Sequence, residues 1–363
     1  MKIEGIDKVL IIGSGPIVIG QACEFDYSGT QACKALREQG YKIVLVNSNP
    51  STIMTDPVMA DATYIEPLNV KRLEEIIEKE RPDALLPNLG GQTGLNLACE
   101  LNKAGVLDKY GVKVIGVNLE AIERGEDREI FKATMQKLGI DTPRSGICHT
   151  VEEAEKIVSE IGFPVVVRPA YTMGGAGGGF CYNVEELRTI CSNGLELSMT
   201  HQCLIEESIL GWEELEVEVV RDAKNQMIAI CFIENIDPVG VHTGDSFCAA
   251  PFLTISKDLE NRLKEQAFKI VESIGVIGGT NVQFAHDPKS DRVVIIEINP
   301  RTSRSSALAS KATGFPIAFV SAKLAAGLTL DQIPYWRDGS LEKYTPSGDY
   351  VVLKFARWAF EKF

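Results

Sequence analysis

The segment from Arg168 to Gly179 constrains this chain most, because it places five glycines within the six positions from Gly174 to Gly179. Glycine has no Cβ atom, so such a loop reaches positive φ values cheaply and lets its backbone approach a ligand closely. Successive backbone N–H groups in such a loop form a concavity that suits phosphate oxygens. Because Arg168 ends the strand predicted to enter the loop, we interpret the segment as a phosphate-binding loop. A surface hairpin without a ligand is the alternative.

Composition limits the class of protein. The chain has 363 residues, enough for two or three domains, and a net charge of −13, which argues against nucleic acid or an anionic membrane as the main partner. The nine cysteines form no Cys-x-x-Cys pair and no cluster with histidine, so neither a zinc site nor a disulfide framework is indicated. Free thiols suit a reducing compartment, and we find neither a signal pattern nor an apolar run of membrane-spanning length. We therefore expect a cytoplasmic protein.

The first part of the chain alternates strand-like and helix-like segments. Strands are predicted at 8–12, 42–46, 83–86 and 113–115, and helices at 28–38, 70–79 and 94–103. This alternation predicts a parallel sheet with right-handed crossovers. We assign residues 1–126 to a doubly wound, Rossmann-like α/β domain.

A dinucleotide-binding motif is the obvious alternative for this first domain. Its glycines are Gly13, Gly15 and Gly20, so the third lies two positions late for G-x-G-x-x-G. The second predicted strand ends in residues 47–49, Asn-Ser-Asn, where a ribose-binding carboxylate is expected. We favour a scaffold reused for another purpose over a nicotinamide site.

The remaining sequence predicts two α+β lobes. Residues 127–205 form a small lobe with the glycine-rich loop at its tip, and residues 206–363 form a large lobe. In the small lobe, a helix over 127–138 ends at Gly139, and Thr150 and Asn183 are predicted to cap two further helices. In the large lobe, strands are predicted at 215–219 and 227–233, and an amphipathic helix at 256–274.

A late hairpin carries the most informative polar residues. Its predicted strands span 280–285 and 293–299, with a turn-rich connector at 287–291. Glu297 and Asn299 are two apart and share a face, and a turn about Ser290 sets Gln283 opposite Glu297 and Asn281 opposite Asn299. Amide and carboxylate oxygens that converge in this way suit Mg²⁺ or Mn²⁺ held together with phosphate oxygens. A hydrogen-bonded polar patch at a strand end is the alternative.

Two arginines, Arg301 and Arg304, follow the predicted metal ligands directly. Beside metal ions they could neutralise an acyl phosphate and a small oxyanion substrate, or they could pair with surface carboxylates. His242 lies in a polar loop at 240–246 and could contact phosphate, although a loop histidine is often simply solvated.

These features together resemble the ATP-grasp fold and, more closely, the family of carbamoyl-phosphate synthetase large chains. The resemblance runs from about residue 8 to residue 363 and is carried by the segments 20–29, 90–93, 242–246, 297–301 and 305–314. The family's large chain has two similar halves, and this sequence resembles the first, carboxyphosphate-forming half. A second half is not present, so we expect a fragment of a larger chain.

The resemblance implies an ATP- and bicarbonate-dependent ligase step in carbamoyl phosphate synthesis. Bicarbonate is phosphorylated to carboxyphosphate, which reacts with ammonia to give carbamate. The resemblance also implies two partners, a glutaminase small subunit that supplies ammonia and the C-terminal half that phosphorylates carbamate. The pathway would serve arginine and pyrimidine biosynthesis.

The resemblance assigns roles to individual residues. The ATP-binding residues would be Arg128, Arg168, Met173, Gly174, Gly175, Glu207, Ile209, Glu214, Gly240, Val241, His242 and Thr243. Two Mg²⁺ or Mn²⁺ ions would be held by Gln283, Glu297 and Asn299, with Glu297, Arg301 and Arg304 as catalytic residues. A potassium ion would lie near Glu214, Asn235, Asp237 and Ser246. Beside this last shell, Pro238 and Phe252–Leu253 depart from the family pattern.

Two alternative functions share the same fold. A biotin carboxylase would use the same carboxyphosphate chemistry, but its Glu-His pair is absent from the Thr-Ser-Arg-Ser-Ser run that follows Arg301. A non-catalytic ATP-binding fragment would keep the fold and the nucleotide site but lack turnover without its partners.

Overall fold

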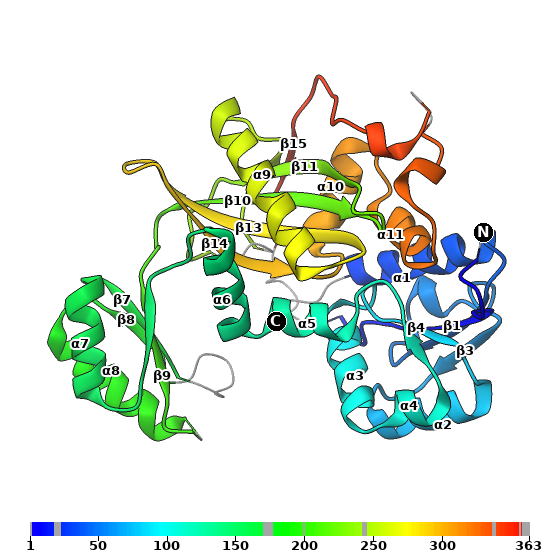
Figure 1. The fold of residues 1–363 in the computed structure, drawn as a ribbon, viewed down its shortest axis with the longest axis horizontal. Helices are drawn as coiled ribbons and strands as arrows, with labels where there is room; N and C mark the ends of the chain where they lie inside the picture. Colours follow the sequence, from blue (N-terminus) through cyan, green and yellow to red (C-terminus); the bar gives the residue numbers. More distant parts are fainter. Residues whose placement is uncertain are drawn as a thin grey trace.

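The computed structural model describes residues 2–17, 23–169, 177–198, 200–241, 245–335, 339–355 and 357. Three sheets organise these residues: a five-stranded sheet near the N-terminus, a four-stranded sheet and a six-stranded sheet (Figure 1). Within the described residues, no helix is both long and apolar enough to cross a membrane.

The N-terminal sheet is parallel, with strand order β3-β2-β1-β4-β5, which confirms the doubly wound prediction. Its strands are buried apolar runs covered by helices on both faces, as parallel sheets require. The prediction missed β3, α4 and α5, which are short and partly exposed. The elements are β1 (Lys8–Ile12), α1 (Glu24–Glu38), β2 (Lys42–Asn47), η1 (Ile53–Thr55), β3 (Ala62–Ile65), α2 (Val70–Glu80), β4 (Ala84–Leu86), α3 (Gly91–Lys103), α4 (Val106–Tyr110), β5 (Lys113–Val114) and α5 (Leu119–Glu126).

The four-stranded sheet forms a small lobe with strand order β6-β9-β7-β8, all antiparallel. Helices α7 and α8 pack on one of its faces. The predicted caps are confirmed: Thr150 Oγ1 accepts from Glu153 N at 3.2 Å, and Asn183 Oδ1 accepts from Glu186 N at 2.9 Å. The elements are β6 (Ser145–Cys148), α7 (Val151–Ile161), β7 (Val165–Pro169), β8 (Gly179–Cys181), α8 (Val184–Leu197) and β9 (Cys203–Glu207).

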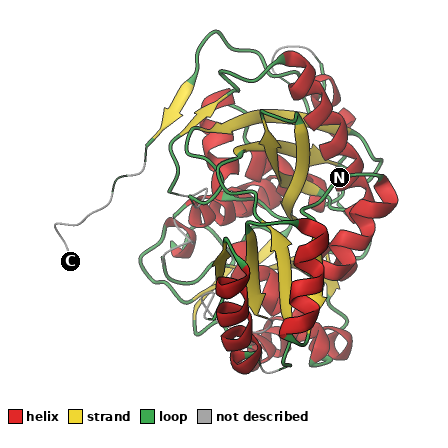
Figure 2. Cartoon of the chain, turned by 90° about the vertical axis from the view of Figure 1, so that its left-hand side faces the viewer, coloured by secondary structure: helices red, strands yellow, loops and turns green. Residues whose placement is uncertain are grey.

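The six-stranded antiparallel sheet forms the large lobe, with β14 and β15 at its edges. In Figure 2, β15 is the strand nearest the C-terminal end of the chain. Helix α9 covers one face, and α10 and α11 cover the other. The elements are β10 (Glu213–Arg221), β11 (Met227–Asn235), β12 (Cys248–Ala250), α9 (Lys257–Ile274), β13 (Gly278–Asp287), β14 (Arg292–Asn299), α10 (Arg304–Thr313), α11 (Ile317–Ala325), η2 (Leu330–Gln332), η3 (Leu341–Lys343) and β15 (Val352–Lys354).

Helix α6 (Arg128–Leu138) was assigned to the small lobe from the sequence, but it packs on the large lobe. Gly139 ends it, as predicted, whereas Asp127, which was predicted as its first residue, is its N-cap. However, its apolar residues Phe131 and Met135 belong to the core of the large-lobe sheet, although the chain continues from α6 into the small lobe. The chain therefore passes between the lobes along 139–144 and returns along 208–212 (Figure 1). The boundaries 1–126, 127–205 and 206–363 stay a proposal.

The β13–β14 hairpin has the predicted register at its functional end. Gln283 pairs with Glu297 and Asn281 pairs with Asn299. A bulge makes this possible: Phe284 pairs with Ile295, so Ile296 is an extra residue on β14. Because neighbouring side chains on a strand point to opposite faces, an unbulged hairpin with the same turn would set Ile296, not Glu297, opposite Gln283.

Candidate active site

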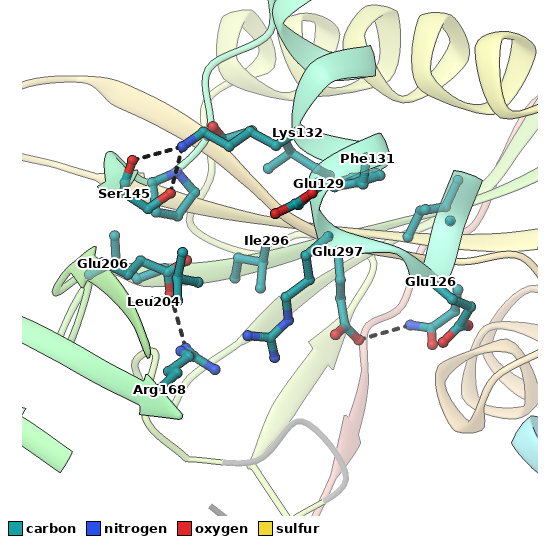
Figure 3. A pocket seen from close by; sticks show the side chains of 18 of the residues that line it. Glu126, Glu129, Phe131, Lys132, Ser145, Arg168, Leu204, Glu206, Ile296 and Glu297 are labelled. Carbon is teal, nitrogen blue, oxygen red and sulfur yellow. Dashed lines mark hydrogen bonds and ion pairs between the residues drawn. The ribbon is translucent and has the colours of Figure 1, made fainter. Parts of the chain in front are cut away.

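A cavity of about 700 Å³ lies between the two lobes. The pocket-facing side of the small-lobe sheet forms one wall, and α6 and β14 form the other (Figure 3). Its lining includes Gln92, Glu126, Arg128, Glu129, Lys132, Thr142, Pro143, Ser145, Ile147, Arg168, Leu204, Glu206, Ile209, Ile295, Ile296, Glu297, Ile298, Asn299 and Arg301. The structure therefore brings together six of the predicted ligand and catalytic positions, Arg128, Arg168, Ile209, Glu297, Asn299 and Arg301.

Basic side chains enter this cavity from both lobes. Arg168 on β7 is ion-paired with Glu206, with 3.2 Å between its Nη2 and the Glu206 Oε1. Arg128 begins α6 and is exposed. Lys132, which the sequence analysis did not single out, lies one turn further along α6 and donates to the backbone oxygen and the hydroxyl of Ser145 at 2.9 and 2.7 Å (Figure 3). Cations on opposite walls suit a ligand with several negative charges.

Two of the three predicted metal ligands are amides, and their side-chain nitrogens are engaged within the protein. Gln283 Nε2 donates to Asn281 Oδ1 at 3.1 Å, and Asn299 Nδ2 donates to Glu297 Oε1 at 3.1 Å. Among the described residues, the amide oxygens of Gln283 and Asn299 accept no hydrogen bond, and Glu297 forms no ion pair. Two amide oxygens and an exposed carboxylate are hard donors, so this set fits Mg²⁺ or Mn²⁺.

Asn281 is hydrogen-bonded to two of these predicted ligands, Gln283 and Asn299, and the sequence analysis gave it no role of its own. It is fully buried, and its Oδ1 accepts from Gln283 and, at 3.5 Å, from Asn299 Nδ2. Its Nδ2 donates to Glu216 Oε2 and Glu218 Oε1, both at 2.8 Å. The sequence signal that could have revealed this role of Asn281 is the alternating glutamates of β10, because β10 pairs with β13 in the sheet.

Glu218 lies at the bottom of this polar network with no exposed surface. Ser303 Oγ donates to its Oε1 at 3.2 Å, and Ser306 Oγ donates to its Oε2 at 2.8 Å. Burial raises the pKa of Glu218 to about 8, and the charge of Glu216 adds to the rise, against the hydrogen bonds from Ser306, Asn281 and Ser303. A carboxyl group is thus kept protonated at neutral pH beneath the site.

This raised pKa predicts a loss of stability in mild alkali. The reference pKa is 4.5, so between pH 4.5 and about 8 the folded chain holds a proton that the unfolded chain has lost. The stabilisation from Glu218 is fully present below pH 4.5 and is lost as the pH rises through about 8, a change of a few kcal/mol in the free energy of unfolding. Urea unfolding at pH 6 and pH 9 should show a smaller loss in Glu218→Gln than in the wild type. An equal loss in both would contradict the assignment, and Glu129→Gln, at an exposed carboxylate, should keep the wild-type loss.

Arg301 receives its contacts from the N-terminal domain. Its Nε donates to Gln92 Oε1 at 3.3 Å, its Nη1 donates to Thr302 O at 3.2 Å, and its guanidinium lies 5.6 Å from the ring centre of Phe25. Burial lowers the pKa of Arg301, and the charges of Glu126 and Glu297 oppose that change. The first domain therefore completes the wall beside the predicted metal ligands, which periodicity alone did not indicate.

Other predicted site residues lie elsewhere or outside the described residues. Met173, Gly174, Gly175, His242 and Thr243 lie outside them. Glu207 and Glu214 are buried and are not among the described residues that line the cavity, and Arg304 begins α10 beyond it. Gly240 lies against the turn at 209–212, where a Cβ atom would come within 2.4 Å of Leu210 Cδ1, and Val241 is exposed.

The predicted potassium shell is an internal hydrogen-bond cluster. Ser246 Oγ donates to Asn235 Oδ1, and Asn235 Nδ2 donates to Glu216 Oε1 at 2.9 Å. Asp237 Oδ2 accepts from Phe247 N at 2.7 Å. Potassium binding at this cluster stays a prediction.

Comparison with known proteins shows which family this chain resembles. Residues 5–124 match the family described as the carbamoyl phosphate synthase preATP-grasp domain, and residues 127–333 match the carbamoyl-phosphate synthase L chain, ATP binding domain. The chain belongs to the carbamoyl-phosphate synthase large-chain family. It is 60% identical over its whole length to the carbamoyl phosphate synthase large chain of Archaeoglobus fulgidus, and 57% identical to that of Thermotoga maritima. It spans about a third of the length of these relatives, 34% and 33%.

Solved structures with the same fold include other ATP-grasp enzymes. The biotin carboxylase of Campylobacter jejuni, solved with an ATP analogue, has a TM-score of 0.70 at 23% identity, covering 90% of this chain and 72% of that chain. The biotin carboxylase domain of Hydrogenobacter thermophilus 2-oxoglutarate carboxylase, solved with MgADP and bicarbonate, has a TM-score of 0.68 at 23% identity, covering 90% and 70%. At these identities the likeness confirms the ATP-grasp fold of this family member and nothing finer.

Proposed function

We propose that this chain uses ATP to phosphorylate bicarbonate to carboxyphosphate, which then reacts with ammonia to give carbamate. The observation that carries the proposal is the hairpin that pairs Gln283 with Glu297, because Glu297, Asn299 and Arg301 at its end line an interlobe cavity in a large-chain family member. Phosphoryl transfer needs positioning and charge neutralisation more than it needs a protein nucleophile. The cavity provides both.

ATP would lie between the lobes, with Arg128 and Arg168 at its phosphates and Ile209 at its base. Arg168 would exchange its ion pair with Glu206 for a phosphate oxygen. The remaining nucleotide contacts that we propose are those of Met173, Gly174, Gly175, Glu207, Glu214, Gly240, Val241, His242 and Thr243. Glu207 could take part only through its backbone, because Arg144 and Arg292 occupy its carboxylate.

Gln283, Glu297 and Asn299 would hold two Mg²⁺ or Mn²⁺ ions. When bound, these ions would screen the negative charge of the phosphates. Glu297, in the middle of the three, supplies the carboxylate that both ions would share. Asn281 fixes the amide orientations that leave the ligand oxygens available.

Arg301 would neutralise bicarbonate and the acyl phosphate, with Arg304 in support. Replacing Arg301 with lysine keeps the charge but loses the planar fork, so we expect a fall in kcat of about 10²-fold, and a larger fall in Arg301→Ala. Steady-state kinetics at saturating ATP and bicarbonate would measure this. Equal activity in the two variants would exclude charge neutralisation by Arg301.

The wider assignment rests on the large-chain family. Ammonia would come from a glutaminase small subunit, and the C-terminal half of the large chain would phosphorylate carbamate. The complex would work in the cytoplasm, in arginine and pyrimidine biosynthesis. A potassium ion beside Asn235 and Asp237 would support the nucleotide side of the site.

Bicarbonate-dependent hydrolysis of ATP by the 363-residue chain tests the proposal directly. We expect phosphate release that depends on bicarbonate and is insensitive to added biotin. Stimulation by biotin would favour a biotin-carboxylase-like enzyme, the activity of the structural neighbours. Tight ATP binding without hydrolysis would favour a non-catalytic fragment, which the one-third coverage of the relatives makes the second candidate.

A further inference from the structure

Arg292, the first residue of β14, contacts both segments that join the two lobes. On the first segment, its Nε donates to Asp141 Oδ2 at 2.6 Å, and its Nη2 donates to Thr142 O at 3.4 Å. The second segment begins after Glu207, whose Oε1 and Oε2 lie 2.8 and 3.0 Å from the Arg292 Nη2 and Nη1. The guanidinium also lies 5.7 Å from the ring centre of Trp212, further along that segment.

Glu207 is the buried centre of this group, with its side chain 8% exposed. Besides the two nitrogens of Arg292, it accepts from Arg144 N at 2.8 Å and Arg144 Nε at 2.7 Å. Burial alone would raise the pKa of Glu207, but the hydrogen bonds from Arg292 and Arg144 lower it overall. Glu207 is therefore ionised at neutral pH, and removing Arg292 would leave a buried charge with one partner fewer.

A backbone hydrogen bond adds to these side-chain contacts. Ile295 N, three residues after Arg292 on β14, donates to Asp141 O at 2.9 Å. The same strand then continues to Glu297 and Asn299. The first connecting segment is thus attached to β14 at two points just before the metal-binding end.

The attached segments are also walls of the cavity. Thr142 and Pro143 line it from the first segment, Ile209 from the second, and residues 295–299 from β14. Arg292 and Glu207 are not among the described lining residues, so they lie behind the wall.

We propose that Arg292 is a positioning residue that clamps both interlobe segments onto β14. The nucleotide-facing wall and the strand that carries the metal ligands then move as one unit when the lobes close. Rotation between the lobes would then occur at the residues around this clamp, because hinges are a few loop residues that absorb the change in φ and ψ. The nucleotide in this inference rests on the proposed function, whereas the clamp itself rests on the contacts above.

The test compares Arg292→Gln and Arg292→Lys with the wild-type chain. Because the clamp holds the nucleotide-facing wall and not the reacting groups, its loss should weaken binding more than chemistry, and we expect the KM for ATP to rise at least about tenfold while kcat changes less. Hydrogen exchange should accelerate in both 139–144 and 208–212. Arg292→Lys keeps the charge without the planar fork, so its KM and its exchange rates should lie between those of the wild type and Arg292→Gln. If Arg292→Gln does not fold, Arg292→Lys decides the test.

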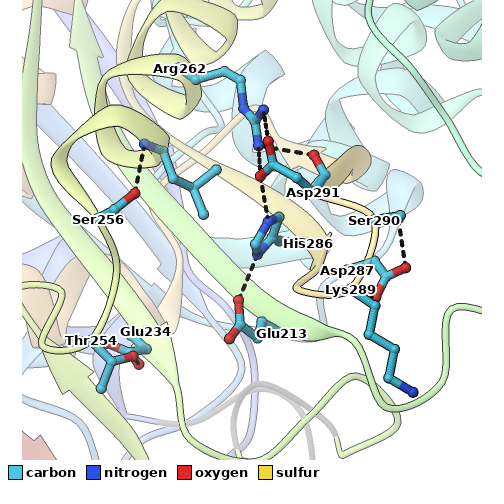
Figure 4. A network of polar contacts seen from close by, with 11 residues as sticks. Glu213, Glu234, Thr254, Ser256, Arg262, His286, Asp287, Lys289, Ser290 and Asp291 are labelled. Atoms are coloured by element: carbon cyan, nitrogen blue, oxygen red, sulfur yellow. Dashed lines mark hydrogen bonds and ion pairs between the residues drawn. The ribbon is translucent and has the colours of Figure 1, made fainter.

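Arg262→Gln is the matched control. Arg262 forms a similar two-pronged pair with Asp291, the residue just before Arg292, at 2.9 and 3.0 Å (Figure 4). That pair is more exposed and contacts His286 rather than either connecting segment. The control should therefore leave the KM for ATP and the exchange of both segments unchanged.

Two outcomes would overturn the clamp: wild-type exchange in both segments of Arg292→Gln, or equal effects from Arg262→Gln. A wild-type chain that does not bind ATP would instead contradict the proposed function. The exchange measurement would still decide the clamp in that case, because it needs no nucleotide.

Discussion

Replacing Glu297 with glutamine is expected to lower bicarbonate-dependent ATP hydrolysis by about 10³-fold, or about 4 kcal/mol of transition-state stabilisation. The change removes a negative charge and one oxygen donor from the centre of the predicted metal set. It also replaces the acceptor of the Asn299 Nδ2 hydrogen bond. Because Glu297 is exposed at the cavity wall, the fold should be kept.

The measurement is kcat at saturating ATP, bicarbonate and Mg²⁺, with a thermal melt to confirm folding. Glu129→Gln is the matched control, since Glu129 lines the same cavity from α6 but contacts none of the predicted metal ligands (Figure 3). We expect it to change kcat less than about fivefold, as surface substitutions usually do. Near-wild-type activity in Glu297→Gln, or a similar loss in Glu129→Gln, would contradict the metal assignment.

Asn281→Leu is expected to destabilise the fold by about 3 kcal/mol or more. Leucine has nearly the same shape as asparagine but cannot donate a hydrogen bond. Both Glu216 and Glu218 would lose a donor, and both carboxyl groups have no exposed surface. Glu216 would keep Asn235, and Glu218 would keep Ser303 and Ser306, so the fold should weaken without being abolished.

Urea unfolding at pH 7 measures this loss. The same substitution at Asn96, which is exposed on α3, should change the free energy of unfolding by less than about 0.5 kcal/mol. Asn281→Leu should also weaken metal binding, because Gln283 and Asn299 lose their common acceptor. A variant as stable as the wild type would show that the two buried carboxyl groups do not depend on Asn281.

Much of the fold could be predicted from local patterns. Apolar runs at 8–12 and 42–46 predict buried parallel strands, and the caps at Thr150 and Asn183 fix two helix starts, because these signals act within a few residues. The position of α6 could not be predicted in this way. Its apolar residues fit any neighbouring core, and only the packing of Phe131 and Met135 shows that it belongs to the large lobe.

The residues that line the site were predicted only in part. Arg128, Arg168, Glu297, Asn299 and Arg301 do line one cavity. Gln92 and Phe25 were missed as partners of Arg301, because they are 209 and 276 positions away in the sequence and no local pattern links them. Lys132 and Asn281 were missed because their roles are contacts with other elements.

The sequence by itself determined the family, the alternation of strands and helices in the first domain and the chemical character of the late hairpin. The pairs Gln283–Glu297 and Asn281–Asn299 were predicted from a turn about Ser290, and only the tertiary structure decided how they form. The observed turn pairs Asp287 with Arg292 and would alone set Ile296 opposite Gln283, so it is the single extra residue of the β14 bulge that brings Glu297 there. Side chains alternate between faces with a period of two, so one residue decides whether that carboxylate lies beside Gln283 or on the opposite face of the strand.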